Sequence, residues 1–365
     1  MFFLWTQMKK LLISFVALML CFQAFSQDSE SSANYAGLTL IPRLDLTPYY
    51  SKADGAWGFS HGNSSIYTLF EGSASEYFSW TLANHWISTG RLDYGDDFEY
   101  GWPYTSLGYS NTTNLIDLCF IDLTFDNWMI SLGKDMILTG GFEYDDWDWD
   151  VHPEFATSLW NGLPVYQWGG KVTYTTPNEG HEFAVQATTS PFAERFFTKK
   201  LLTASAQYKK YGEVYEVIAS ASMLGYDPAI PSGAPDFYPV FFLGQRVYLG
   251  DWTITLDLSN NNCFASNEDE TVSYLRSGVG INAALTWAPS DKIELTWRGL
   301  HSRPLQEFTP PGETRWNTGL ICHYYPLKDS DALRIHAYAN YDNIGGDSNL
   351  TFSLGIRYNF LINLW

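Results

Sequence analysis

The sequence predicts an all-β fold, an antiparallel transmembrane β-barrel of sixteen strands. Three observations predict it. Apolar and polar residues alternate over segments of strand length, short and long connections alternate along the chain, and Trp, Tyr and Phe make up 17% of the residues. No segment after the first 26 residues is apolar over the ~18 residues that a membrane-spanning helix needs. A barrel of fourteen or eighteen strands would fit the same observations.

The alternation is clearest at the two ends of the chain, because a strand with one face in lipid is apolar at every second residue. In the first segment, Leu38, Leu40, Leu44 and Leu46 alternate with residues that include Thr39, Arg43, Asp45 and Thr47. The last segment has one apolar parity, with small, polar or charged residues between its members: Leu350, Phe352, Leu354, Ile356, Tyr358 and Phe360.

Sixteen segments have this character, and we expect each to form one strand. They cover residues 37–49, 64–72, 76–88, 114–124, 127–139, 163–175, 181–190, 201–209, 212–224, 237–249, 251–260, 274–288, 291–301, 313–325, 331–341 and 349–361.

The connections alternate in length. Those after even-numbered strands are short, for example 73–75, 178–180 and 289–290, whereas those after odd-numbered strands are mostly longer, notably 89–113 and 140–162. Bacterial transmembrane barrels have short periplasmic turns and longer outer loops. The alternation therefore predicts a barrel in the bacterial outer membrane, surrounded by lipid, with both termini on the periplasmic side.

The amino-terminal segment has the features of a secretory signal peptide, with Lys9 and Lys10 before an apolar run and Ala24-Phe25-Ser26 as a cleavage site. We expect cleavage after Ser26, which leaves residues 27–365 as a single barrel domain. The net charge is -19 for the whole chain, and the loss of Lys9 and Lys10 makes the mature chain still more acidic. Such a charge argues against nucleic acid as a partner.

The run Ile130-Ser-Leu-Gly-Lys-Asp-Met-Ile-Leu-Thr-Gly-Gly-Phe-Glu-Tyr-Asp145 resembles the signature strand and loop of the phosphate-selective porin O and P family. Leu354-Gly-Ile-Arg-Tyr-Asn-Phe360 resembles the closing strand of many outer-membrane barrels, which the barrel assembly machinery reads through its aromatic end. The resemblance implies a sixteen-stranded, homotrimeric porin through which small hydrophilic solutes diffuse. Phosphate selectivity is not carried over, because those porins line their pores with Lys and Arg and this chain is acidic.

The third outer loop, residues 140–162, contains GGFEYDDWDWDVHPEF at positions 140–155. The resemblance implies a third loop that folds into the lumen and narrows it. Its carboxylates would then place negative charge in a narrow aqueous passage, where low-dielectric walls focus the field. Alternatively, they belong to an ordinary solvated surface loop. These predicted constriction residues are Glu143, Asp145, Asp146, Asp148, Asp150 and Glu154.

The wall opposite this loop is predicted to carry arginines, because an arginine facing lipid costs ~2 to 4 kcal/mol at the membrane midplane. Strand parity points most of the charged wall residues inward, whereas the parity around Arg246 is poorly defined. An acidic loop and an arginine wall would create a transverse field that selects solutes by size and charge. Alternatively, each arginine pairs with a carboxylate and stiffens the barrel. The predicted wall residues are Arg43, Asp45, Arg246, Glu294, Arg298, Arg334, His336 and Arg357.

Lys134 conflicts with this pattern, because it shares the parity of the lipid-facing Leu132 and Met136. Either its side chain reaches the membrane interface, or a bulge at Gly133 shifts the register.

Other chemistry is weakly supported, and no cofactor and no enzymatic activity are expected. Asp146, Asp148 and Asp150 could bind Ca²⁺ in an irregular site within 143–154, but an EF-hand needs Gly and a carboxylate where Val151 and Thr157 stand. Paired carboxylates could also serve a glycosidase, but acidic loops contain such pairs at many spacings.

Gly58-Phe-Ser-His-Gly62 matches the G-x-S-x-G pattern of hydrolases, but that turn works only between a parallel strand and a helix. An outer-membrane lipase is therefore disfavoured. The sequence favours a passive diffusion porin, and the alternative is a plugged outer-membrane barrel that serves as a scaffold for adhesion or partner binding.

Overall fold

The computed structural model describes residues between 35 and 364, with gaps. The described residues are 35–52, 54–60, 64–87, 90–92, 99–100, 104–105, 116–145, 152, 155–157, 159, 163, 165–191, 202–225, 237–260, 263–266, 273–276, 278–304, 314–328 and 330–364. The predicted signal peptide, residues 1–26, lies outside them.

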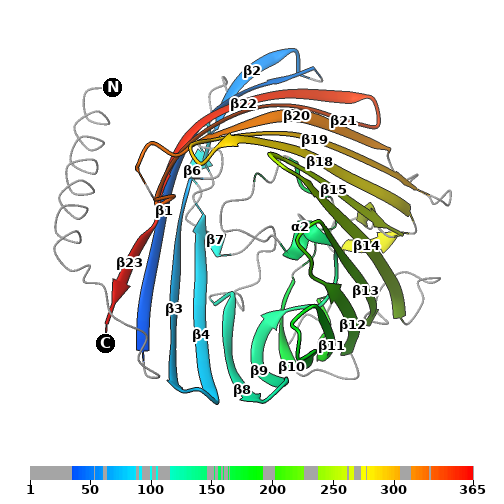
Figure 1. Ribbon diagram of the computed structural model, residues 1–365. Coiled ribbons are helices and arrows are strands. Elements are labelled where there is room, and N and C mark those ends of the chain that lie inside the picture. The colour runs from blue at the N-terminus through cyan, green and yellow to red at the C-terminus, as the bar shows by residue number, and fades with distance from the viewer. Residues whose placement is uncertain are drawn as a thin grey trace.

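Sixteen long antiparallel strands form the wall, and Figure 1 shows them as a ring seen along its axis. Each corresponds to one segment expected from the alternation. They are β1 (Tyr35–Ser51), β3 (Ser65–Ser75), β4 (Phe78–Ile87), β8 (Leu118–Phe125), β9 (Trp128–Met136), β10 (Tyr166–Thr175), β11 (His181–Thr189), β12 (Leu202–Lys210), β13 (Tyr215–Gly225), β14 (Phe237–Leu249), β15 (Trp252–Ser259), β18 (Gly278–Ser290), β19 (Ile293–Pro304), β20 (Arg315–Tyr324), β21 (Leu333–Ile344) and β22 (Asp347–Tyr358).

The sheet closes on itself where β1 pairs with β22, with Arg43 opposite Arg357 and Leu46 opposite Leu354. The short strand β23 (Phe360–Asn363) continues this pairing along β1, with Leu40 opposite Phe360. Closure leaves no open edge along these strands, and in a membrane every backbone polar group must find such a partner. The predicted sixteen-stranded barrel is therefore confirmed.

Alternate residues face opposite sides of the wall. Leu44 and Leu46 are 51% and 47% exposed on the outside, whereas Arg43 and Asp45 are 6% and 0% exposed on the inside. The interior carries many buried hydroxyl side chains, including Thr173, Thr188, Thr203, Ser205, Ser220 and Ser222. An apolar outer surface and a polar interior are what a membrane-spanning barrel requires.

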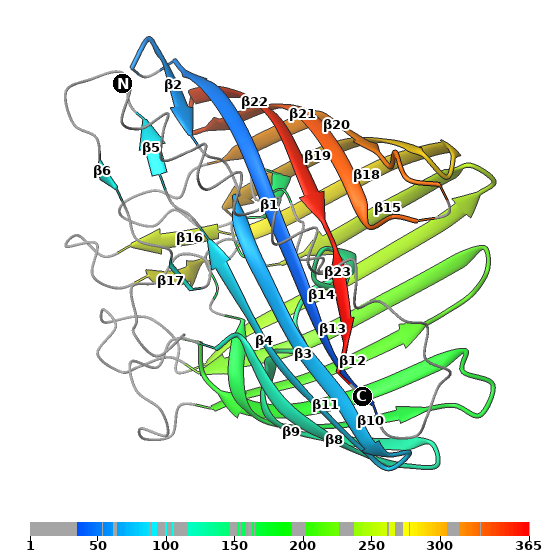
Figure 2. The ribbon, with the colours of Figure 1, turned by 90° about the vertical axis from the view of Figure 1, so that its left-hand side faces the viewer.

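The connections at the two ends of the barrel differ in length, as Figure 2 shows from the side. One end carries short turns, which are residues 76–77, 126–127, 176–180, 211–214, 250–251, 291–292 and 325–332. The other end carries the long connections, together with the two-residue turn 345–346 between β21 and β22. The small strands of the long connections are β2 (Ala56–Ser60), β5 (Gly90–Leu92), β6 (Glu99–Tyr100), β7 (Tyr104–Thr105), β16 (Cys263–Ser266) and β17 (Ser273–Arg276).

Aromatic pairs lie at the ends of the strands near the short turns. Trp128 of β9 contacts Tyr174 of β10, with ring centroids 4.8 Å apart, and Trp252 of β15 stacks on Trp287 of β18 at 5.7 Å. Such amphipathic rings are enriched at membrane–water interfaces. Within the described residues, helix α2 (Phe142–Asp145) is one turn long, and no helix is long and apolar enough to cross a membrane.

Lys134 lies in a regular part of the sheet, opposite Cys119 on β8 and Trp168 on β10. No register shift therefore occurs at Gly133, although its φ is 140°. Lys134 is only 3% exposed, and its ammonium group donates to the carbonyl of Ile116, just before β8 begins. Neither explanation offered from the sequence, a side chain at the interface or a shifted register, describes this arrangement.

Replacing Gly133 with alanine should destabilise the barrel more than replacing Gly346. Both glycines have positive φ, 140° and 105°, which costs an L-residue about 1 to 2 kcal/mol. A Cβ at Gly133 would lie 2.2 Å from the Cys119 carbonyl oxygen, whereas nothing lies within 4 Å at Gly346. This overlap should add about 1 to 3 kcal/mol. Thermal unfolding of the refolded variants in detergent measures the difference, and equal losses of Tm would contradict it.

Candidate pore and the third loop inside it

The third loop, between β9 and β10, enters the barrel. The hydroxyl of Ser220 on β13 donates to the carbonyl of Gly140 at 2.8 Å, and that of Ser222 donates to Leu138 at 3.1 Å. On another part of the wall, Nη1 of Arg315 on β20 donates to the carbonyl of Ala156 at 3.0 Å. Helix α2 accordingly lies within the ring in Figure 1. The described part of the loop thus runs from the β13 wall to the β20 wall.

Asp257 of β15 fixes α2 to the wall. Its two carboxylate oxygens accept hydrogen bonds from the backbone N–H groups of Phe142 and Glu143, at 2.9 and 2.8 Å. These donors belong to the first turn of the helix and have no partner within it. Two glycines make room for the Asp257 carboxylate. A Cβ at Gly141 would lie 2.2 Å from Asp257 Oδ1, and a Cβ at Gly244 would lie 2.5 Å from the same atom.

Glu143 joins two parts of the third loop, because it binds Thr157 further along the same loop. Its carboxylate accepts hydrogen bonds from the backbone N–H of Thr157 at 2.6 Å and from the Thr157 hydroxyl at 2.7 Å. Burial raises the pKa of Glu143 to about 7, although the Thr157 hydrogen bonds act in the opposite direction. Because its pKa is raised and its carboxylate is bound by Thr157, Glu143 contributes less negative charge to the lumen than a free carboxylate would.

Apolar residues of the loop pack against one side of the lumen. Ile137, Tyr144 and Leu159 of the loop pack on inward-facing residues of β13 and β14, and all three are at most 2% exposed. Tyr144 meets Phe242 edge to face, with ring centroids 6.0 Å apart. The Arg246 guanidinium lies 4.0 Å from the Phe142 ring centroid, within range of a cation–π interaction.

On the opposite side of the lumen the loop meets a cluster of three histidines, which are His152 of the loop, His323 of β20 and His336 of β21. His152 Nε2 lies 3.2 Å from His323 Nε2, and the rings of His152 and His336 are 5.2 Å apart. Nη2 of Arg43 on β1 donates to His152 Nδ1 at 3.2 Å. This histidine cluster joins the loop to strands on both sides of the closing seam.

The predicted wall residues lie in the interior. Arg43, Arg357 and Arg334 occupy directly opposite positions on β1, β22 and β21 and are at most 7% exposed. Arg43 Nη2 forms an ion pair of 2.7 Å with Asp45, whose other oxygen accepts from His336 Nε2 at 2.9 Å. The remaining three, Arg246, Glu294 and Arg298, line the open part of the lumen. Their role in selectivity stays a prediction.

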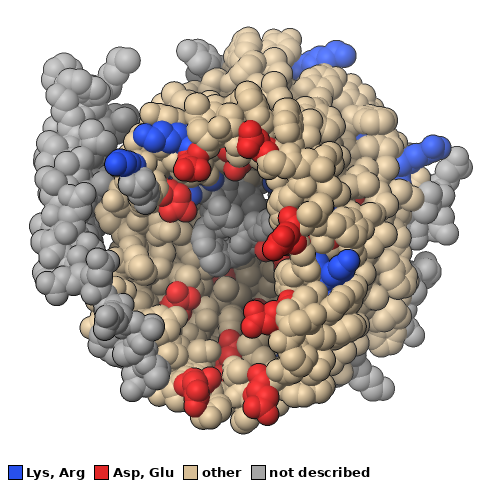
Figure 3. Space-filling model, in the orientation of Figure 1, with Lys and Arg blue, Asp and Glu red and all other residues tan. Residues whose placement is uncertain are grey.

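An open cavity of about 330 Å³ remains between the loop and the wall from β14 to β21. The loop side consists of Phe142, Glu143, His152 and Ala156. The wall side carries charges of both signs, namely Arg246, Asp257, Glu294, Arg298 and Arg334. Figure 3 shows the hollowed opening of the barrel with Asp and Glu side chains around it. Among the described residues, each of these short turns has one exposed acid: Glu76, Asp126, Glu179, Glu213, Asp251, Asp291 and Asp331.

The predicted constriction residues do not form one group in the structure. Glu143 lines the cavity, and Asp145 forms an ion pair with Lys209 of β12, away from the arginine wall. Asp146, Asp148, Asp150 and Glu154 lie outside the described residues, as does most of the segment that could bind Ca²⁺. Within the described part of the chain, no group of three or more His, Cys, Asp or Glu is arranged to hold a metal ion.

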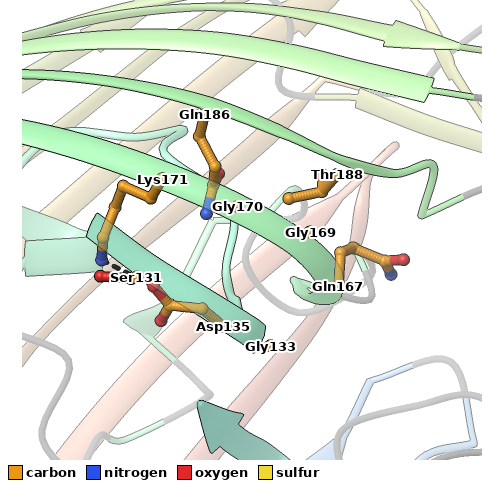
Figure 4. Close-up of a pocket in the computed structure, with 9 residues that line it drawn as sticks. All are labelled: Ser131, Gly133, Asp135, Gln167, Gly169, Gly170, Lys171, Gln186 and Thr188. Atoms are coloured by element: carbon orange, nitrogen blue, oxygen red, sulfur yellow. Dashed lines mark hydrogen bonds and ion pairs between the residues drawn. The ribbon is translucent and has the colours of Figure 1, made fainter. Parts of the chain in front are cut away.

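A second polar cluster in the lumen, shown in Figure 4, is packed shut. Lys171 of β10 pairs with Asp135 of β9 at 2.6 Å. Gln186 of β11 accepts from the backbone N–H of Leu138 at 2.8 Å and donates to the carbonyl of Met136 at 2.9 Å. This cluster has no space for a solute and serves to hold the beginning of the third loop.

Sequence reasoning missed several of the residues that position the loop. Asp257 could have been found, because it lies on the parity opposite to Trp252, Ile254 and Leu256 and must therefore face inward. His323 could have been found in the same way. The partners Thr157 and Lys209 had no local signal, since they meet Glu143 and Asp145 only in the folded chain.

No protein-family model and no curated protein sequence matches this chain. Solved structures match its fold. OmpF of Salmonella typhi, in a complex with daunomycin, has 12% identity and a TM-score of 0.63 over 92% of this chain and 100% of that chain. The outer membrane channel DcaP of Acinetobacter baumannii has 11% identity and a TM-score of 0.60 over 92% of this chain and 100% of that chain.

The trimer form of OmpT, an outer membrane protein of Vibrio cholerae, has 15% identity and a TM-score of 0.56 over 90% of this chain and 100% of that chain. At such identities the likeness concerns the fold alone. It is the fold of outer-membrane barrels, and with the apolar outer surface it agrees with the predicted location in the bacterial outer membrane.

Replacing Asp257 with alanine should release α2 from the wall. Two backbone N–H groups lose a charged acceptor, and a hydrogen bond to a charged group contributes about 1.5 to 3 kcal/mol. We expect a lower Tm and faster protease cleavage within residues 140–165. Asp257→Asn keeps one oxygen acceptor and should lose less. Cleavage at the wild-type rate in Asp257→Ala would show that the aspartate does not hold the loop.

The stability contributed by Glu143 should depend on pH. Its pKa in the folded chain is about 7, above the ordinary 4.5. The folded state therefore binds the proton more tightly than the unfolded state, and stability falls as the pH rises from about 4.5 to about 7. Glu143→Gln has no titrating group and should lose less stability over this range. Thermal unfolding of both proteins at several pH values tests this, and parallel curves would be inconsistent with a buried, titrating Glu143.

Proposed function

We propose that this protein is an outer-membrane channel through which small hydrophilic solutes diffuse passively. The observation that carries the proposal is the open cavity between the inward-folded third loop and the charged wall. An aqueous passage lined by polar and charged groups lets hydrophilic solutes cross, and a narrow part of it selects among them. The fold likeness to DcaP, which is described as an outer membrane channel, supports the same class of function. Permeation needs no catalytic residue, so we do not propose an enzyme.

Selectivity in this proposal comes from charges on the cavity wall together with the acidic third loop. Arg246, Arg298 and Arg334 supply three positive charges, and Asp257 and Glu294 supply two negative ones. Because Glu143 is bound by Thr157, the carboxylates of the wall carry more of the field than that loop residue does. Charges of both signs across a narrow passage favour small dipolar solutes over large ions of either sign.

A plugged barrel that serves as an adhesion or binding scaffold is the second candidate. The observation in its favour is the apolar packing of the loop on β13 and β14, which fills that side of the lumen. A scaffold needs a closed lumen, whereas a channel needs a continuous one. Electrical conductance therefore distinguishes the two.

We also propose that the protein forms a homotrimer and belongs among the porins related to the O and P family. The resemblance of residues 130–145 and the trimer form of OmpT, which has the same fold, support this proposal. Its mass after mild extraction, measured by light scattering with correction for detergent, tests the assembly.

The refolded protein in planar lipid bilayers should give stepwise increases in conductance. Arg298→Gln should then raise the cation-to-anion permeability ratio by a factor of about two or more, because potentials in such passages reach several kT. Glu294→Gln should lower the ratio. Lys292→Gln is the matched control, since Lys292 lies exposed in the short turn 291–292 and outside the cavity, and should leave the ratio unchanged.

Two outcomes would count against this function. Folded protein without any conductance would favour the scaffold. If Arg298→Gln and Glu294→Gln both conduct with the wild-type permeability ratio, these wall charges do not set the selectivity.

A further inference from the structure

We propose that Arg298 of β19 is the centre of a binding site in the channel for small hydroxylated monocarboxylates, which are organic acids with one carboxylate and several hydroxyl groups. The inference rests on the proposed channel function and names the class of solute that the channel carries. The site is formed by β14, β15, β18 and β19, whose residues around Arg298 are all described and regularly paired. It uses no residue of the third loop.

The guanidinium of Arg298 lines the cavity without a partner. Among the described residues it forms no ion pair and no hydrogen bond, and its Nε is buried. Glu143 attracts it through space, but the Glu143 carboxylate is bound by Thr157 and does not pair with it. A buried donor without an acceptor costs free energy. A solute carboxylate would supply two acceptors in the geometry of the guanidinium fork.

The other two arginines of the cavity are bound by residues of the wall. Arg246 lies 3.6 Å from the Glu216 carboxylate, and Arg334 forms a hydrogen bond with the Tyr325 side chain. A carboxylate that approached either of them would compete with an existing partner. Arg298 is therefore the arginine at which an anionic group gains most from binding.

The two acids of the cavity wall also have donors. Both oxygens of Asp257 accept from backbone N–H groups of α2. Glu294 Oε1 faces His323 Nδ1 at 3.3 Å and accepts from the Thr296 hydroxyl at 3.4 Å. Neighbouring donors offset part of the negative charge, so these acids repel one incoming carboxylate less than free acids would.

A hollow with small side chains lies beside Arg298. Along one row of the sheet, Arg298 is directly opposite Ala284, Ala284 is opposite Thr255, and Thr255 is opposite Arg246. Because neighbouring strands lie ~4.8 Å apart, the backbones of the two arginines are about 14 Å apart. Only a methyl group and a threonine side chain fill the wall between them. A small solute can therefore lie against the wall with its carboxylate at Arg298.

Hydroxyl and amide groups border this hollow in the two neighbouring rows. Thr253, Thr286 and Thr296 are directly opposite one another in the row nearer the short turns, and Asn282 lies in the row nearer α2. All four line the cavity. The hydroxyls of Thr286 and Thr296 are 2.9 Å apart, and each can make further hydrogen bonds. Such groups both donate to and accept from the hydroxyls of a solute.

The surrounding acids limit the solute to one negative charge. Glu294 lies four residues from Arg298 on the same face of β19, and Asp257 lies in the row nearer α2. The short turns at the mouth add exposed acids, such as Asp251 and Asp291. Repulsion from these acids grows with the charge of the solute, whereas Arg298 supplies a single positive charge. The site therefore favours a monocarboxylate over a dicarboxylate or a phosphate dianion.

A ligand-observed NMR titration of the folded protein in detergent tests the site with gluconate as the probe. Sorbitol has similar hydroxyls without a carboxylate, and hexanoate has a carboxylate without hydroxyls. We expect gluconate to bind at least about tenfold more tightly than sorbitol, because hydrogen bonds to a charged group are lost, and about threefold more tightly than hexanoate, because neutral ones are lost.

Substitutions of Arg298 separate a binding site from a general field. Arg298→Gln should weaken gluconate binding at least about tenfold and leave sorbitol binding unchanged. Arg298→Lys cannot form the bidentate pair and should weaken gluconate binding by a smaller factor. It should keep the wild-type ratio of potassium to chloride permeability, because the sign of the field is unchanged. Arg303→Gln is the matched control, since it removes the same charge from an exposed position of β19 outside the cavity, and should bind gluconate like the wild type.

A second variant does not depend on the folding of the Arg298 variants. Thr286→Val keeps the arginine and removes one hydroxyl of the hollow. It should weaken the binding of gluconate and leave the binding of hexanoate unchanged. Loss of both to the same extent would contradict a role of the hydroxyls in selecting the solute.

The outcomes separate the site from the channel. Equal binding of gluconate by the wild type and Arg298→Gln would overturn the site, and so would equal binding of gluconate and sorbitol. Tighter binding of inorganic phosphate than of gluconate would overturn the proposed class of solute. Conductance without gluconate binding would leave the channel standing and overturn the site. Gluconate binding that depends on Arg298 in folded protein without conductance would support the site and overturn the channel.

Discussion

Closure of the sheet is the constraint on which the rest of the molecule depends. A membrane offers no water to the backbone, so the pairing of β1 with β22 must satisfy the two strands that would otherwise be edges. Once the sheet is closed, each strand has one face in lipid and one face in an enclosed, polar space. That space allows charged residues such as Arg334 and Asp45 to be buried with partners, and it allows an irregular loop to exist at the depth of the membrane.

The loop inside the barrel is held by two kinds of contact at opposite sides. Toward β13 and β14 it is held by apolar packing and by the Asp257 carboxylate, which packs closely against Gly141 and Gly244. Toward β1, β20 and β21 it is held by hydrogen bonds between His152 and the side chains of Arg43 and His323. The first attachment combines apolar contacts with one carboxylate, whereas the second consists of polar and charged side chains.

Much of the barrel could be predicted from the sequence, because the period of two is a local property that each strand shows by itself. Lys134 and the strand 237–249 were exceptions. The parity of that strand is hard to read because Phe241 and Leu243 face outward while Val240 and Phe242 face the third loop, so that both faces are apolar. Less of the candidate site could be predicted from the sequence. Glu143 was expected as a free charge, but its carboxylate is bound by Thr157, fourteen residues further along the chain. Neither that hydrogen bond nor the histidine cluster has a periodic signal, because side chains distant in sequence create them.

The attachment of the loop also implies an order of assembly. Phe142 reaches an acceptor 115 residues away on β15, Ala156 an arginine 159 residues away on β20, and His152 a partner 171 residues away. Contacts of such high sequence separation form late, because the ends of long chain segments must first be brought together. Until the later strands are in place, Ile137, Tyr144 and Leu159 have only part of the wall against which to pack. Complete seating of the loop therefore needs β14, β15 and β20 to be in place, and the His152 contacts to Arg43 and His323 connect β1 with β20 inside the closed wall.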